Sequence, residues 1–178
     1  MLSPKRPSSG FINARFLALL PGWYRTKNKQ HRAEHLMRHI MVATDGSSGA
    51  KRAIDVAAGL ARALAGDLLI ATVADSQLEE EAQQFARVEG NIGDVLEALA
   101  AKTLKDAEAR ARHLGVSRIE LRTGSGDVAQ SLIDIAAGNS VEMIVLGRRG
   151  RGQLAGLLLG SVSQKLVSLA PCAVTVVP

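Results

Sequence analysis

The sequence VEMIVLGRRGRGQLAGLLLGSVSQKLVSLAPCAVTVV, residues 141–177, carries a strand, a glycine-rich loop, a helix and a second strand in succession. The apolar run 141–146 predicts a buried strand, and the loop 147–160 follows it directly. Ser161 is expected to cap a short helix over 162–169, which Pro171 stops. The apolar run 173–177 predicts a last strand. This order of elements is typical of an α/β fold.

The chain before this stretch shows the same alternation. Apolar runs predict strands at 39–44 and 68–73, an alternating pattern predicts a strand at 116–122, and helical periodicity predicts helices between them. The first of these helices begins at Ser47 or Ser48 and stops at Gly66, and later helices cover 94–114 and the stretch up to Gly138. We therefore predict an α/β fold with an open five-stranded parallel sheet and helices on both faces.

Ligands of such sheets bind at the carboxyl ends of strands, where the strand order reverses. The search for a functional site therefore narrows to the loops after Thr44, Val73, Arg122 and Leu146.

Composition agrees with a globular protein. The chain has 178 residues, of which 47% are hydrophobic and 22% are charged, so it can bury a real core. It contains no apolar run of about 18 residues, which argues against a spanning helix. Its single cysteine, Cys172, excludes an internal disulfide and a cysteine-based zinc site. We therefore expect a reducing compartment and a cytoplasmic protein.

The positive charge is unevenly distributed. Residues 1–39 hold eight Lys or Arg and one acid, whereas residues 40–178 have a net charge of −2. We place a boundary near residue 38, between a basic, aromatic-containing N-terminal extension (1–37) and one domain (38–178). Because the domain is nearly neutral, we expect no specific nucleic-acid partner.

The N-terminal extension is open to three interpretations. It has the composition of a flexible tail, of an organelle-import presequence, and of a segment that associates with an anionic membrane surface. In the last case Phe11, Phe16 and Leu20 would lie on the apolar face of a short helix that enters the interface, with Trp23 just beyond it, while Lys and Arg meet the head groups.

The glycine-rich loop is the strongest functional signal. Gly147 follows a strand, and Gly160-Ser161 precede a helix, so the loop joins a strand end to a helix N-terminus. Glycines let backbone N–H groups approach an anion, and a helix N-terminus adds free donors. Arg148 and its neighbours Arg149 and Arg151 add positive charge. The arrangement predicts a phosphate site, although it is neither a Walker A loop nor a Gly-x-Gly-x-x-Gly fingerprint.

The sequence resembles the universal stress protein family over residues 38–178. The pattern Gly147-x2-Gly150-x9-Gly160-Ser161 is similar to the one that marks the ATP-binding branch of that family. The segments DGS (45–47), Gly126-Asp127 and APCAV (170–174) add to the resemblance. It implies a Rossmann-like fold of the nucleotide-binding alpha-hydrolase type.

The resemblance also implies roles for single residues. Thr44 and Asp45 would lie at the adenosine pocket, with Asp45 near the ribose, the phosphates or a bound Mg²⁺. Val73 would contact adenine. The phosphates and ribose would be held by the loop glycines and the helix start, namely Gly147, Gly150, Gly160 and Ser161. The apolar strand 173–177 would pair with a second copy to form a homodimer.

These features favour an ATP-binding stress-response or regulatory protein that acts through nucleotide-dependent conformation, dimerisation and a regulatory protein partner of unknown identity. Its cofactor would be ATP with Mg²⁺. No histidine, cysteine or serine triad can be assembled at the strand ends to act as a base. Two alternatives stay open. One is a slow ATPase or self-phosphorylating protein that uses Asp45, Mg²⁺ and Ser161, and the other is a nucleotide-free dimeric scaffold.

Overall fold

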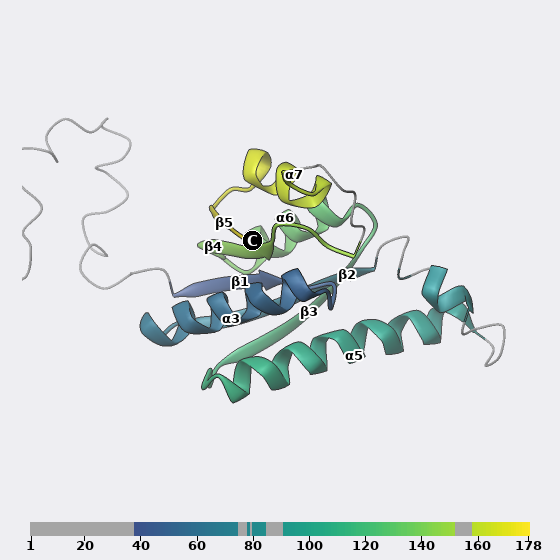
Figure 1. Cartoon of the computed structure of the whole chain (residues 1–178), viewed down its shortest axis with the longest axis horizontal. Helices are drawn as coiled ribbons and strands as arrows, with labels where there is room; N and C mark the ends of the chain where they lie inside the picture. Colours follow the sequence, from purple (N-terminus) through teal and green to yellow (C-terminus); the bar gives the residue numbers. More distant parts are fainter. Residues whose placement is uncertain (1–37, 75–77, 79, 85–90, 152–157) are drawn as a thin grey trace, which may run out of the picture. The chain divides into compact units, whose positions relative to one another are not determined.

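The computed structural model describes residues 38–178, apart from 75–77, 79, 85–90 and 152–157 (Figure 1). The N-terminal extension and the middle of the glycine-rich loop lie outside the described residues, so the interpretations of the extension stay predictions. The elements follow one another as β1 (His39–Ala43), α3 (Ser48–Ala63), β2 (Asp67–Ala74), α5 (Ile92–His113), β3 (Ile119–Ser125), α6 (Val128–Gly138), β4 (Met143–Gly147), α7 (Ser161–Leu169) and β5 (Ala173–Val177). Residue 78 and residues 80–84 are also helical.

The sheet has five parallel strands in the order β3-β2-β1-β4-β5. The predicted fold class is therefore confirmed. From β1 the chain moves outward through β2 to β3, and it then crosses to the other side of β1 to form β4 and β5. The strand order thus reverses between β1 and β4, which is where a ligand is expected in a sheet of this kind.

Helices cover both faces of the sheet (Figure 1). Side chains of β1 alternate between the two faces. Ile40 and Val42 pack in the core that α3 and α5 complete. Met41 packs in the core under α6 and α7. All three are fully buried, which explains why the strand reads as a continuous apolar run. Within the described part of the chain, no helix has the length and hydropathy needed to cross a bilayer.

The third strand begins and ends later than its hydrophobic pattern predicts. The prediction of 116–122 was wrong, because β3 runs from Ile119 to Ser125 and pairs with β2 as far as Ala74. Gly124 therefore belongs to the strand and not to a turn, and the predicted loop after Arg122 does not exist. A Cβ at Gly124 would collide with the Ser131 side chain of α6. Glycine here marks close packing of a helix on a strand.

Two helix ends also differ from prediction. Gly66 is not the left-handed residue after α3, since that conformation belongs to Ala65 (φ 50°). A Cβ on Gly66 would lie 2.5 Å from the Arg38 carbonyl oxygen, so glycine permits close passage of the chain beside β1. Ser161 is the first residue of α7, and Gly160 is its N-cap.

Candidate functional site

A cleft of about 350 Å³ opens at the carboxyl ends of β1 and β4. All the residues that the sequence predicted for the site line this cleft, from four separate segments of the chain: Thr44, Asp45, Val73, Gly147, Arg148, Gly150, Gly160 and Ser161. The structure therefore brings the predicted residues together at the point where the strand order reverses.

The β1–α3 turn is held by its own polar side chains. Thr44 is buried, its N–H donates to the Ala71 carbonyl at 2.9 Å, and its Oγ1 accepts from the Gly46 N–H at 3.2 Å. Asp45 Oδ1 accepts from the Ser47 N–H at 2.9 Å, which forms an Asx turn. Ser47 then caps α3 by accepting from the Ala50 N–H at 3.1 Å. The turn thus enters the cleft in a fixed conformation.

Asp45 also holds the start of the glycine-rich loop. Its Oδ2 accepts from the Arg151 N–H at 2.9 Å, and its carbonyl accepts from Arg151 Nε at 2.5 Å. Gly150 passes so close that a Cβ there would lie 2.5 Å from Asp45 Oδ2. One carboxylate therefore joins the loops that follow β1 and β4, and any larger residue at position 150 would have to displace this carboxylate.

The floor of the cleft is a contact between two backbones. A Cβ on Gly147 would lie 2.7 Å from the Gly49 carbonyl carbon and 3.1 Å from the Ala50 nitrogen. A Cβ on Gly49 would likewise lie 2.8 Å from the Arg149 carbonyl oxygen. The end of β4 and the first turn of α3 approach each other this closely because both carry glycine.

The N-terminus of α7 closes the opposite side. Gly160 donates its N–H to the Arg148 carbonyl at 2.9 Å, so this amide closes the loop and is not free for a ligand. Ser163 is buried, and its hydroxyl lies 3.0 Å from the same carbonyl oxygen and 2.9 Å from that of Gly160. Ser161, Val162 and Ser163 have no acceptor for their N–H groups within the helix, and the N-cap residue, Gly160, has no side chain with which to cap α7. These N–H groups are hydrogen-bond donors that the cleft offers to an anion.

The other wall of the cleft is apolar. Val73 is buried, at 9% exposure, and the other apolar residues that line the cleft are Ala43, Ala50, Ala71, Val128, Leu132, Leu146 and Val162. Among the described residues that line the cleft, the ionisable side chains are Asp45 and three arginines. The cleft thus combines an apolar wall with a positively charged end, and this combination suits a flat ring joined to an anionic group.

An ion pair joins the two helices on the α6–α7 side. Lys165 of α7 lies 2.7 Å from Oδ2 of Asp127, which also caps α6 by accepting from the Gln130 N–H at 3.0 Å. The bond from Lys165 and that backbone N–H both favour the carboxylate and lower the pKa of Asp127 below its ordinary value of 3.8. Both groups are exposed, so the pair adds little stability.

Sequence reasoning missed several residues that shape this cleft. Arg151 counted only as extra positive charge, and Glu81, which pairs with it at 3.0 Å, was placed in a solvated run of acids. Gly49 and Ser163 carried weak signals, a glycine in a helix start and a serine two residues after Ser161. The contacts of Gly49 and Ser163 with Arg149 and Arg148 span 100 and 15 residues of sequence, so no local pattern could reveal them.

The comparisons with known proteins agree with this architecture. Residues 37–178 match the universal stress protein family. A universal stress protein of Thermus aquaticus is 32% identical over 145 residues, which are 80% of this chain and 99% of that protein. The protein YxiE of Bacillus subtilis is 30% identical over 148 residues, with the same coverage of 80% and 99%. A solved universal stress protein in complex with cAMP is 28% identical, with a TM-score of 0.59 and coverage of 80% and 98%. The chain therefore belongs to the universal stress protein family.

Proposed function

We propose that this protein binds an adenine nucleotide in the cleft between β1 and β4, and that this nucleotide is ATP. The observation that carries the proposal is the pairing of an apolar wall at Val73 with the free N–H groups at the start of α7. The cAMP complex of the 28% identical relative supports a nucleotide as the ligand. In our proposal the base lies against Val73, and the phosphates lie against Ser161 and the glycine-rich loop.

Asp45 is suited to a Mg²⁺ ion that arrives with ATP. Both of its carboxylate oxygens accept one backbone hydrogen bond, and each keeps a second lone pair. Mg²⁺ commonly takes one carboxylate together with phosphate oxygens and water, and this site needs no further acidic ligand for that arrangement. The described residues contain no group of three or more His, Cys, Asp or Glu side chains that could hold a metal ion. The residues thus fit a metal held largely by the nucleotide.

We infer a regulatory role, in which bound nucleotide changes the conformation that a partner protein recognises. Asp45 is the only acid among the described lining residues, and both its oxygens already accept backbone N–H groups. General-base catalysis needs a group within reach of the attacking water, and phosphoryl transfer needs that group positioned. Slow hydrolysis or self-phosphorylation through Asp45 and Ser161 is the second candidate, because both lie in the cleft.

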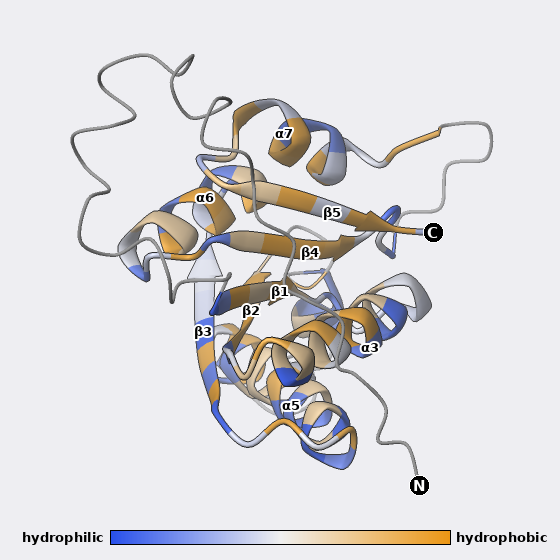
Figure 2. Ribbon diagram, turned by 90° about the vertical axis from the view of Figure 1, so that its left-hand side faces the viewer, coloured by the Kyte–Doolittle hydropathy of each residue, from blue (hydrophilic) through white to orange (hydrophobic). Residues whose placement is uncertain are grey.

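We further propose a homodimer through β5. The two edge strands of the sheet differ in character: β3 carries Glu120 and Arg122, whereas β5 (AVTVV) has no charged side chain (Figure 2). Charges blunt an edge against pairing, and an apolar edge favours it. Ala173 donates to the Glu142 carbonyl of the β4 side, so the alternate residues Val174 and Val176 point their backbone groups outward. These groups are available to a second copy.

The test is to remove one N–H from the start of α7 without disturbing the helix. Proline is favoured at the first helical position, and Gly160 (φ −73°, ψ 162°) has the backbone conformation that a following proline requires. Ser161→Pro therefore deletes an N–H and a hydroxyl, and the control Ser161→Ala deletes the hydroxyl alone. Loss of a charge-assisted hydrogen bond of about 1.5–3 kcal/mol predicts ATP binding at least about tenfold weaker than in the control. Calorimetry that gives equal ATP affinity for both variants would contradict the assignment of the phosphate site.

A further inference from the structure

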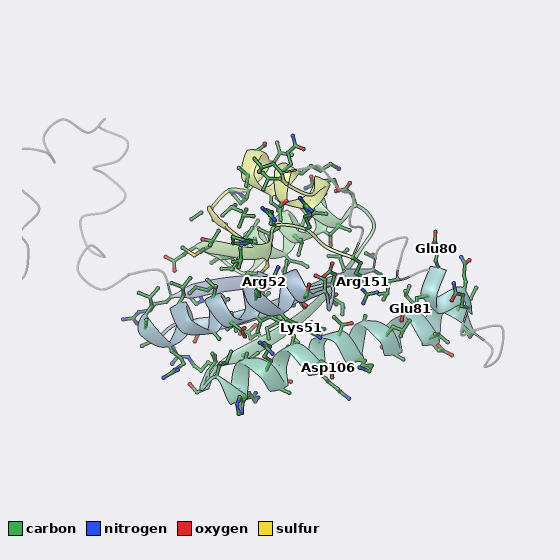
Figure 3. All side chains as sticks on the ribbon, viewed as in Figure 1. Lys51, Arg52, Glu80, Glu81, Asp106 and Arg151 are labelled. Atoms are coloured by element: carbon green, nitrogen blue, oxygen red, sulfur yellow. The ribbon has the colours of Figure 1, made fainter. Side chains whose placement is uncertain are left out.

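Arg151 is shared between the cleft and a segment outside it. Its backbone N–H and its Nε donate to Asp45, which places the side chain at the mouth of the cleft. Its Nη1 donates to Glu81 Oε2 at 3.0 Å. Figure 3 shows Arg151 at the end of the sheet, on the side of the helical residues that carry Glu81. The same guanidinium lines the cleft, so it is within reach of an anionic ligand there.

Glu81 is held in place by its neighbours and not by Arg151 alone. Leu78 and Ala82, on the same helical segment, are 5% and 0% exposed, so the segment is anchored by packing. The side chains of Arg151 and Glu81 are 30% and 42% exposed. Glu81 is thus a carboxylate on an anchored segment beside a partly solvated arginine, and it occupies Nη1 of that arginine while Nε stays on the Asp45 carbonyl.

We propose that Glu81 and the phosphates of the ligand compete for the Arg151 guanidinium, and that this pair sets how strongly the cleft prefers a longer phosphate chain. The inference rests on the proposed nucleotide binding. Arginine binds phosphate and carboxylate through the same planar set of N–H donors, and here Nε serves the Asp45 carbonyl and Nη1 serves Glu81. A phosphate that engages both terminal nitrogens of Arg151 has to share or replace the bond from Nη1 to Glu81, and the cost of weakening that bond lowers the affinity. A ligand without phosphate leaves the bond between Arg151 and Glu81 intact, so this bond does not lower its affinity.

The size of the effect follows from the exposure of the pair. Partly exposed ion pairs contribute about 0.2–1 kcal/mol, which corresponds to a change in affinity of about 1.5- to 5-fold. Removing the charge of Glu81 should therefore tighten the binding of ATP by about this factor and leave adenosine binding unchanged. The increase should grow from AMP to ATP, because the distal phosphates reach farther toward the mouth of the cleft.

The experiment is calorimetric titration of adenosine, AMP and ATP into the wild type, Glu81→Gln and the matched control Glu80→Gln. Glu80 is the exposed neighbouring acid, so its variant carries the same change in net charge. We expect tighter ATP binding by Glu81→Gln alone. Equal ATP affinity in Glu81→Gln and the wild type would overturn the competition. An equal gain in both glutamine variants would overturn it too, because it would reflect net charge and not the pair.

A double-mutant cycle separates competition from a structural effect of Glu81. In an Arg151→Gln background, Glu81→Gln should leave ATP affinity unchanged, because nothing is left to compete for. An effect of Glu81→Gln that persists in this background would overturn the proposal. If the wild type binds neither adenosine nor ATP, the proposed nucleotide binding itself fails, and the competition fails with it. If the wild type binds ATP and the cycle shows no coupling, only the competition fails.

Discussion

Replacing Gly147 by alanine tests the backbone contact that forms the floor of the cleft. The new methyl group would lie 2.7 Å from the Gly49 carbonyl carbon and 3.0 Å from its oxygen. Carbon atoms in contact are normally about 3.5–4.0 Å apart, so β4 and the first turn of α3 would have to separate by close to 1 Å. Backbone atoms at both ends of the contact cannot turn away as a flexible side chain can. We therefore expect the added methyl group to strain the backbones of β4 and α3, because neither can move aside to make room for it.

The expected loss of stability is about 1–2 kcal/mol. Overpacking in a well-packed region costs about 1–3 kcal/mol, and the restriction of the unfolded chain by alanine offsets about 0.4–1 kcal/mol of it. At roughly 3–5 °C per kcal/mol for a domain of this size, the thermal midpoint falls by about 3–10 °C. Urea unfolding followed by circular dichroism should show a lower midpoint with an unchanged slope.

Gly59→Ala is the matched control. Gly59 lies within α3, and a Cβ there would meet nothing within 4 Å. Alanine is the better helix former, so this variant should gain about 0.5–1 kcal/mol. The same chemical change thus has opposite signs at two positions. If Gly147→Ala unfolds at or above the wild-type midpoint, β4 and α3 are not in the contact described here.

Three other outcomes are expected. Val176→Pro removes an outward N–H of β5 and should give a monomer mass by light scattering, whereas Val176→Thr, which keeps this N–H, should stay dimeric. Lys165→Met should raise the pKa of Asp127 in a carboxyl NMR titration. Because the folded pKa of Asp127 lies below its ordinary value of 3.8, the pair stabilises the fold above that pH, and the stability difference between wild type and variant should close as the pH falls through the folded pKa. Turnover of ATP should stay well below ~1 per second, a rate common for enzymes, and a faster activity that Asp45→Ala abolishes would identify an enzyme.

The sheet and the position of the cleft could be predicted because their signals are local. Ile40, Met41 and Val42 form an apolar run because both faces of β1 are covered. Gly147 and Gly160 lie against other backbone segments, and Gly150 lies against the Asp45 carboxylate. At each of these positions the size or polarity of the residue itself indicates the environment in which it lies.

Other features depend on partners far away in the chain and had no local signal. Gly124 looks like a turn residue, yet it is in a strand because Ser131 packs against it. Gly160 was expected to offer its N–H to phosphate, but the Arg148 carbonyl takes it. The pairing of Arg151 with Glu81 joins residues 70 positions apart, and either residue alone reads as an exposed charge.

The central position of β1 has a consequence for biosynthesis. Its partner β2 emerges from the ribosome soon after it, but its other partner, β4, begins about a hundred residues later in the chain. At a synthesis rate of 5–20 residues per second, one edge of β1 stays unpaired for roughly 5–20 s until β4 has been synthesised. During that interval an apolar strand edge, which in the finished protein lies wholly inside, is open to other nascent chains. We expect chains stalled before Met143 to aggregate or to need a chaperone, although the full-length protein buries the three central residues of the same strand completely.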